Sequence, residues 1–195
     1  MPKRVFIIHG WGGFPTEGWF PWLKKKLEAD GYVVTIPAMP NPPHPKKEAW
    51  MPALAAVIEN PDADTYLVGH SLGCEAILLY LQSLPADIVI RGVVLVAPVA
   101  GEESITNRIN IVEGAWDVLG PWIRSEIDWN AIRSHAKKFV GIFSDNDMWI
   151  RPETADTFQQ KLGAKTVLLH DHKHFSGDDG ITELPDVYDA ITSYV

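Results

Sequence analysis

The sequence predicts an α/β fold in which about six parallel strands form one sheet with helices on both faces. Short apolar runs alternate with longer segments of helical periodicity along the chain. Several runs are continuously apolar, which is typical of strands buried on both faces of a parallel sheet. This alternation favours right-handed crossovers and a doubly wound sheet.

Six apolar runs are the predicted strands. They are rich in Val, Ile, Leu, Phe and Tyr, which favour extended backbone in a packed sheet. In chain order these strands are residues 4–9, 32–37, 65–69, 92–97, 138–143 and 165–169.

Five segments between or after these strands have helical patterns. In the first, Trp19, Leu23 and Leu27 follow one another at four-residue spacing, which gives a helix one apolar face. The predicted helices are residues 18–30, 46–58, 72–84, 153–162 and 184–194.

Two segments interrupt the alternation. Residues 37–45 contain five prolines, which exclude a helix or a central strand and predict a stiff loop. Residues 101–135 are too long for a simple connection, and we interpret them as a small helical cap over the functional end of the sheet. The alternative is a surface excursion unrelated to function. We expect one domain, residues 1–195, that carries this cap-like insertion.

Composition limits the class of protein. A formal net charge of −8 argues against nucleic acid or an anionic membrane as the main partner. The single cysteine, Cys74, excludes an internal disulfide. The apolar run 5–8 is too short for a signal peptide, and no run reaches transmembrane length. We therefore expect a cytoplasmic protein, a monomer by default, that acts on a small molecule.

The segment Gly69-His70-Ser71-Leu72-Gly73 joins a predicted strand to a predicted helix. A Gly-x-Ser-x-Gly at such a turn is the nucleophile elbow of α/β hydrolases. The glycines let strand and helix approach closely, and the strained turn lifts the serine hydroxyl above the sheet. The alternative is an ordinary Gly-Ser turn.

A serine nucleophile needs a histidine base and a carboxylate that orients the base. In this fold the chain order is Ser, then Asp or Glu, then His. Asp147 and His174 follow Ser71 in that order, each after a predicted strand, where open α/β sheets place their sites. Asp145 competes with Asp147 for the role of the acid. His172, and more weakly His170, compete with His174 for that of the base.

The glycine-rich loop after the first strand, residues 9–13, predicts an oxyanion hole. We expect the backbone N–H groups of Trp11 and Leu72 to form it, with His9 holding the loop. The loop lacks the motifs of nucleotide sites. The spaced histidines at 170, 172 and 174 suggest a metal only superficially, because alternate side chains of an extended segment point to opposite faces. We expect no metal and no cofactor.

Eight tryptophans are many for a chain of this length. Aromatic rings often line small-molecule pockets. The predicted pocket residues are Trp19, Trp116, Trp122 and Trp149.

The chain resembles the small bacterial YdeN-like serine hydrolases, relatives of the retinoblastoma-binding-protein-nine group in the α/β-hydrolase superfamily. The resemblance runs nearly the full length and rests on the segments 7–10, 19–23, 39–42, 69–74, 172–175 and 184–189, together with Trp50. It implies a compact α/β-hydrolase sheet that lacks the first two strands of the superfamily, and a triad of Ser71, Asp147 and His174. The residue before the base, often glycine in the family, is Lys173 here. The retinoblastoma-binding signature Leu-x-Cys-x-Glu is absent, so we do not expect the retinoblastoma protein as a partner.

The sequence therefore predicts a serine hydrolase, carboxylesterase-like, that cleaves a small ester or related acyl substrate through an acyl-enzyme. Two alternatives stay open. One is a binding protein that keeps the fold without catalysis. The other is amidase, peptidase or lyase chemistry in the same site.

Overall fold

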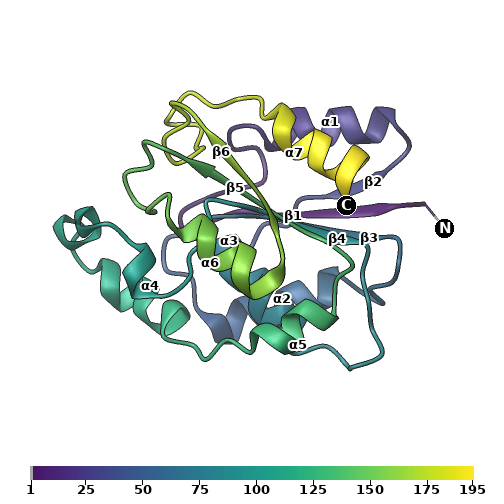
Figure 1. Cartoon of the computed structure of the whole chain (residues 1–195), viewed down its shortest axis with the longest axis horizontal. Helices are drawn as coiled ribbons and strands as arrows, with labels where there is room; N and C mark the ends of the chain where they lie inside the picture. Colours follow the sequence, from purple (N-terminus) through teal and green to yellow (C-terminus); the bar gives the residue numbers. More distant parts are fainter. Residues whose placement is uncertain (1) are drawn as a thin grey trace.

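A computed structural model describes residues 2–195, which form one parallel sheet of six strands in the order β2-β1-β3-β4-β5-β6 (Figure 1). The predicted strands are confirmed with small shifts at their ends. The strands are β1 (Arg4–Ile8), β2 (Val33–Thr35), β3 (Thr65–His70), β4 (Gly92–Val96), β5 (Phe139–Ser144) and β6 (Lys165–Leu169).

Helices cover both faces of the sheet, as the sequence predicts (Figure 1). One face carries α1 (Phe20–Ala29) and α7 (Pro185–Asp189), the latter continued by a π-helical turn, η3 (Ala190–Tyr194). The opposite face carries α2 (Lys47–Val57), α3 (Leu72–Gln82), α5 (Trp129–Ser134) and α6 (Thr154–Leu162).

The core consists of two apolar clusters, one on each face of the sheet. Successive residues of β1 alternate between them, with Val5 and Ile7 in one cluster and Phe6 and Ile8 in the other. All six residues of β3 are buried. The continuous apolar runs in the sequence therefore reflect strands that are packed on both sides.

The edge strand β2 is shorter than the predicted 32–37. It pairs only with β1, through Val33–Thr35, and the proline-rich loop begins at Pro37, which has no N–H to donate to the sheet.

The cap segment, residues 101–135, contains two 3₁₀ turns, η1 (Glu102–Ser104) and η2 (Asn107–Ile111), followed by α4 (Ala115–Ile123) and α5. Only its first part, through α4, lies beyond the sheet (Figure 1). Helix α5 packs against α3 and α6, where Trp129 meets Phe158 edge to face.

The strand order places the functional end of the sheet. The chain moves from β1 outward to β2 and then crosses back to β3 on the other side of β1. The carboxyl ends of β1 and β3 therefore flank the topological switch point, where open α/β sheets bind ligands. None of the helices within residues 2–195 has the length and apolar character needed to cross a membrane.

Gly73, in the first turn of α3, fits against the end of β1 without space for a side chain. A Cβ at this position would lie 2.2 Å from the carbonyl oxygen of Ile8, which is backbone and cannot move aside. We expect Gly73→Ala to lower the free energy of unfolding by about 3 kcal/mol or more, measured by urea denaturation. Gly120→Ala is the control, because its Cβ would meet only the flexible end of Arg124. Equal stability of the two variants would contradict this account.

Glu75 in α3 is fully enclosed, and burial raises the pKa of its carboxyl to about 8. Between its ordinary pKa and that value the folded protein binds more protons than the unfolded chain, so this group's contribution to stability falls as pH rises. We expect the gain in unfolding free energy from Glu75→Gln to grow from pH 5 to pH 8 by up to about 1.4 kcal/mol per pH unit. Urea denaturation at several pH values tests this, with exposed Glu59→Gln as the control. A gain that is independent of pH would contradict it.

Candidate active site

Ser71 lies at the sharp turn between β3 and α3, with φ 52° and ψ −123°. A positive φ is rare for a residue with a side chain and costs on the order of 1–3 kcal/mol. The turn is held by the backbone N–H of Ser71, which donates to the carbonyl oxygen of Val96 at 2.9 Å. The neighbouring glycines permit it, since a Cβ on Gly69 would lie 2.8 Å from Cα of Cys74. The strained strand-to-helix turn that the sequence predicts is therefore present.

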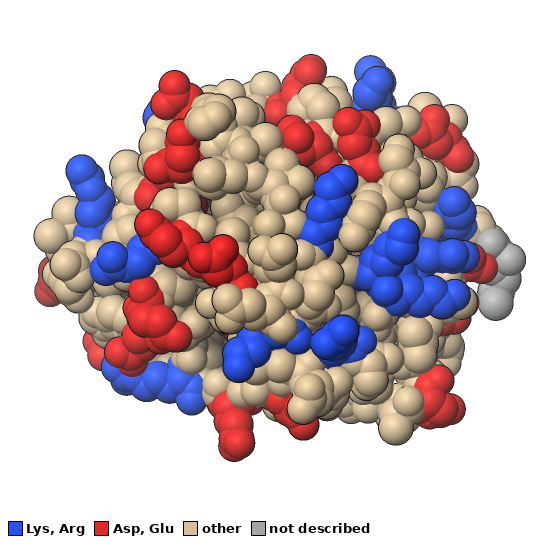
Figure 2. All heavy atoms as spheres, viewed as in Figure 1, with Lys and Arg blue, Asp and Glu red and all other residues tan. Residues whose placement is uncertain are grey.

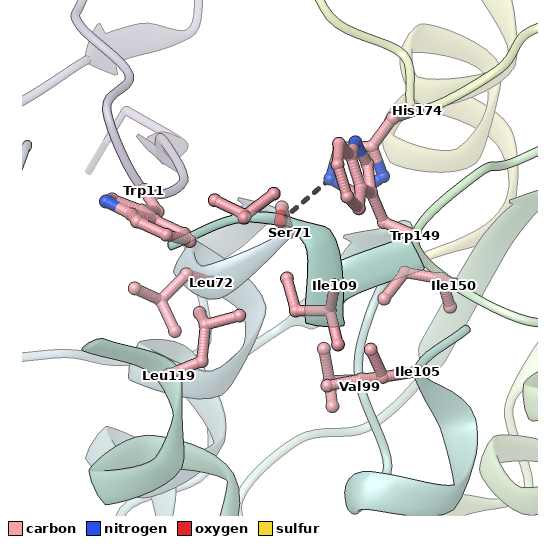
Figure 3. A pocket seen from close by; sticks show the side chains of 11 residues that line it. Trp11, Ser71, Leu72, Val99, Ile105, Ile109, Leu119, Trp149, Ile150 and His174 are labelled. Atoms are coloured by element: carbon pink, nitrogen blue, oxygen red, sulfur yellow. Dashed lines mark hydrogen bonds between the residues drawn. The ribbon is translucent and has the colours of Figure 1, made fainter. Parts of the chain in front are cut away.

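Ser71, His174 and Asp147 form a continuous hydrogen-bonded chain, and Figure 3 shows its contact between Ser71 and His174. His174 Nε2 lies 2.9 Å from Ser71 Oγ, and His174 Nδ1 lies 2.9 Å from Asp147 Oδ2. The side chain of Asp147 is 2 % exposed and that of His174 is 14 % exposed. The three groups thus meet in the order serine, histidine, carboxylate, with Ser71 and His174 lining an open cavity and Asp147 buried behind them.

The carboxylate of Asp147 is fixed at both oxygens. While Oδ2 faces His174, Oδ1 accepts hydrogen bonds from the backbone N–H groups of Trp149 (2.8 Å) and Ile150 (3.1 Å). Asp145, the competing acid, contacts a different histidine, with 2.6 Å between its Oδ2 and His170 Nδ1 on the surface. Asp147 is therefore the carboxylate that reaches His174.

The loop after β5 (residues 145–150, the acid loop) is hydrogen-bonded to the loop after β6 (residues 170–179, the base loop). Asn146 Oδ1 accepts from the N–H of Lys173 at 2.8 Å, and Ser144 Oγ, at the end of β5, accepts from the N–H of His172 at 3.1 Å. Lys173 has φ 47°, a left-handed conformation that favours glycine. This explains why glycine suits the position before the base, and the bond to Asn146 holds the lysine there.

The backbone of His174 is anchored at both polar atoms. Its N–H donates to Asp179 Oδ2 at 3.0 Å, and its carbonyl oxygen lies 2.7 Å from His70 Nε2. Burial, followed by the nearby His174, lowers the pKa of His70 to about 4. His70 is therefore neutral at physiological pH, and its Nε2–H donates to the carbonyl.

The loop after β1 lies directly beside Ser71. A Cβ on Gly10 would come within 3.0 Å of Ser71 Cβ. His9 is buried and holds this loop, with Nδ1 2.9 Å from the carbonyl oxygen of Gly10 and Nε2 accepting from the N–H of Met39 at 3.1 Å. Within residues 2–195 the N–H groups of Trp11 and Leu72 make no hydrogen bond. These two donors are free to meet an oxyanion at Ser71.

An apolar pocket of about 240 Å³ opens at Ser71 (Figure 3). Most of its lining is aliphatic, the rings of Trp11 and Trp149 complete it, and much of the wall comes from the cap segment. The lining residues are Trp11, Ser71, Leu72, Val99, Ile105, Ile109, Val112, Leu119, Trp149, Ile150 and His174. The cap segment is tied to the acid loop by an antiparallel bridge between Ile105 and Ile150 and by the N–H of Thr106, which donates to the carbonyl of Trp149 at 2.8 Å.

The prediction of tryptophans in the pocket was wrong for three of four residues. Trp149 lines the pocket, but Trp19 and Trp122 are each 1 % exposed and belong to the core. Their indole N–H groups donate to the carbonyls of Phe175 (3.0 Å) and Pro45 (3.1 Å). Trp116 does not line the pocket either, because its indole N–H turns to Asn110 Oδ1 at 2.8 Å.

A second cavity of about 500 Å³ meets the first at the nucleophile. We call it the polar groove. It shares Trp11, Ser71, Trp149 and His174 with the pocket, and its other lining residues are Gly10, Gly12, Phe14, Thr16, Glu17, Gly18, His70, Ser176, Gly177 and Asp178. The sequence analysis missed Glu17 and the aliphatic residues of the cap segment. Glu17 follows the glycine-rich loop by four residues, a proximity that could have suggested it.

The three spaced histidines serve different contacts. His170 faces Asp145, His172 Nδ1 lies 2.7 Å from the carbonyl of His170, and His174 faces Ser71 and Asp147. In the described part of the chain, no cluster of three or more His, Cys, Asp or Glu side chains is arranged to hold a metal ion.

This fold and this arrangement of Ser, His and Asp are those of the α/β-hydrolase class, and the comparison with known proteins gives the family. The Serine hydrolase family model matches residues 5–193, so the chain belongs to the serine hydrolase family.

Among individual relatives, the chain is similar to YdeN of Bacillus subtilis strain 168, with 36 % identity over 194 residues that cover 100 % of this chain and 97 % of YdeN. The crystal structure of the ydeN gene product covers 98 % of each chain with a TM-score of 0.88. The serine hydrolase RBBP9 of Rattus norvegicus is 23 % identical over 91 % of this chain and 90 % of its own. Est1E of Butyrivibrio proteoclasticus, at 18 % identity, shares the fold with a TM-score of 0.74 over 100 % of this chain and 88 % of its own.

Proposed function

We propose that this protein is a carboxylesterase-like hydrolase that cleaves a small ester by acyl transfer to Ser71. The observation that carries the proposal is the unbroken contact from Ser71 Oγ through the His174 ring to Asp147, with 2.9 Å at each step. A hydroxyl is a weak nucleophile at neutral pH, and a base in hydrogen-bond contact removes that limitation.

In the first half of the reaction Ser71 Oγ attacks the ester carbonyl carbon and its proton passes to His174 Nε2. The tetrahedral intermediate then collapses. The bond from carbon to the leaving oxygen breaks, and the same proton passes to that oxygen, which leaves as an alcohol. Asp147 holds the His174 Nδ1–H and stabilises the imidazolium that forms between the two transfers.

In the second half water replaces the alcohol. His174 takes a proton from the water, the hydroxide attacks the acyl carbon, and the proton returns to Ser71 Oγ as the carboxylic acid is released. In both halves the N–H groups of Trp11 and Leu72 receive the oxyanion, each worth about 3 kcal/mol at the transition state.

The apolar pocket supports an uncharged acyl group of modest size. Its volume of about 240 Å³ is smaller than that of a pocket for a drug-sized ligand, and its aliphatic walls would leave a charged acyl chain without a partner. We therefore propose short aliphatic or aryl acyl esters as substrates.

The first prediction is that Ser71 carries an activated hydroxyl. We expect a fluorophosphonate probe to add once to the folded protein, as read by intact mass, and to add neither to Ser71→Ala nor to heat-denatured protein. Ser71→Ala should keep its melting temperature, because alanine has the same Cβ and removes only a hydroxyl. A folded protein that takes no label would overturn the proposal and favour a non-catalytic binding protein on this fold.

The second prediction separates the two aspartates. We expect Asp147→Asn to lower kcat for a p-nitrophenyl ester of a short acid by about 10⁴-fold, because the amide no longer stabilises the required histidine tautomer and its charge. Asp145→Asn is the matched control and should retain kcat within about threefold, since its carboxylate contacts exposed His170. The reverse order of effects would assign the acid to Asp145.

A further inference from the structure

The nucleophile lies where two cavities of different chemistry meet. The pocket is lined mainly by aliphatic side chains and has no carboxylate in its lining, whereas the polar groove carries two carboxylates, Glu17 and Asp178. An ester has two halves, an acyl group and an alcohol, and Ser71 attacks the carbon between them. Two cavities that share Ser71 and His174 can therefore receive one half each.

The polar groove suits the alcohol. One of its walls is the stretch of the base loop that follows His174, including Ser176, Gly177 and Asp178. His174 returns its proton to the leaving oxygen, so the departing alcohol lies beside this loop. The aliphatic pocket then receives the acyl group.

The charged groups of the polar groove all favour a cation. No Lys or Arg is among its lining residues, and no basic side chain within residues 2–195 forms an ion pair with Glu17. Glu17 is half-buried, and its carboxylate lies against the loop after β1. A Cβ on Gly13 of that loop would lie 2.7 Å from Glu17 Oε2. On the face shown in Figure 2 many Lys and Arg side chains gather near the chain termini, which lie away from the carboxyl ends of the strands.

One aromatic ring that belongs only to this groove provides a second feature. Phe14, which is 52 % exposed, lines the polar groove alone, whereas Trp11 and Trp149 line both cavities. Aromatic faces beside carboxylates attract alkylammonium groups by cation–π and Coulomb forces together. Neutral alcohols would gain neither attraction.

We propose that the polar groove is a leaving-group subsite that selects esters of ammonium-bearing alcohols, with Glu17 as its main charge and Phe14 as an aromatic wall. This inference rests on the proposed esterase function and specifies its substrate class.

The test compares butyrylcholine with 3,3-dimethylbutyl butyrate, an ester of the same shape in which carbon replaces the quaternary nitrogen. Both present the same acyl group to the pocket, so the ratio of their kcat/KM values reports the charge of the alcohol alone. We expect the folded protein to prefer the choline ester by about tenfold. Glu17→Gln should reduce the preference to about twofold, because the amide keeps the size of the side chain and loses its charge.

Glu59→Gln is the control. Glu59→Gln removes the same charge from an exposed position that precedes the amino end of β3, away from the carboxyl ends of the strands. The variant should keep both turnover rates and the preference for the choline ester. Because the two esters are measured on the same sample, partial unfolding of a variant lowers both rates and leaves their ratio unchanged. Phe14→Leu should also lower the preference, by about threefold.

Two failures are distinguishable. Equal turnover of both esters, or a preference that Glu17→Gln leaves intact, would overturn the cationic subsite and leave the esterase function standing. Turnover of neither ester, in a protein that also takes no fluorophosphonate label, would overturn the proposed function and the subsite with it.

Discussion

The contact between the first turn of α3 and the end of β1 is the constraint on which the site depends. Gly73 brings the helix so close to the carbonyl of Ile8 that a methyl group would not fit. This approach sets the start of α3 and therefore the turn at Ser71, whose positive φ is maintained by the surrounding packing. It also fixes Gly10 beside the serine, so the nucleophile and the predicted oxyanion donors share one rigid contact.

The acid and the base are positioned by a separate mechanism. They stand on the loops after β5 and β6, which side-chain hydrogen bonds join to each other. Three consecutive residues of the acid loop accept hydrogen bonds from the base loop. The donors to Asp145, Asn146 and Asp147 are Asp171, Lys173 and His174, in that order. His70 and Asp179 then fix the main chain of His174 from the other side. The imidazole is thus constrained in position by hydrogen bonds to its own main chain and to the neighbouring acid loop.

The sheet and the three residues of the candidate site could be predicted from the sequence, because they show as local apolar runs and as a fixed order along the chain. Strands buried in a parallel sheet require continuous apolar residues, which are visible in the sequence. Ser71, Asp147 and His174 could be grouped because they follow the chain order of the fold and each comes after a predicted strand. The choice between Asp145 and Asp147 is different, since both carboxylates bond a histidine and only the fold shows which histidine faces Ser71.

The tryptophans show where sequence reasoning fails. In the sequence nothing distinguishes Trp19 and Trp122 from a tryptophan that lines a pocket. In the structure each donates its indole N–H to a carbonyl more than 70 positions away, Trp19 to Phe175 and Trp122 to Pro45. Such pairing between distant segments leaves no local pattern. The pocket is built instead by Ile105, Ile109, Val112 and Leu119, which in sequence look like ordinary core residues of a small cap.

The bridge between Ile105 and Ile150 has a consequence for how relatives of this protein can diversify. The cap segment and the acid loop are joined at this bridge. Ile105 of the cap segment lines the pocket and pairs with Ile150, whose N–H donates to the carboxylate of Asp147 beside His174. Insertions or deletions near Ile105 would shift Asp147 away from His174 as well as reshape the pocket. Side-chain exchanges at Ile109, Val112 and Leu119 leave that bridge alone. The shape of the pocket can therefore be changed by point substitution in the cap, whereas wholesale exchange of the segment needs compensating change in the acid loop.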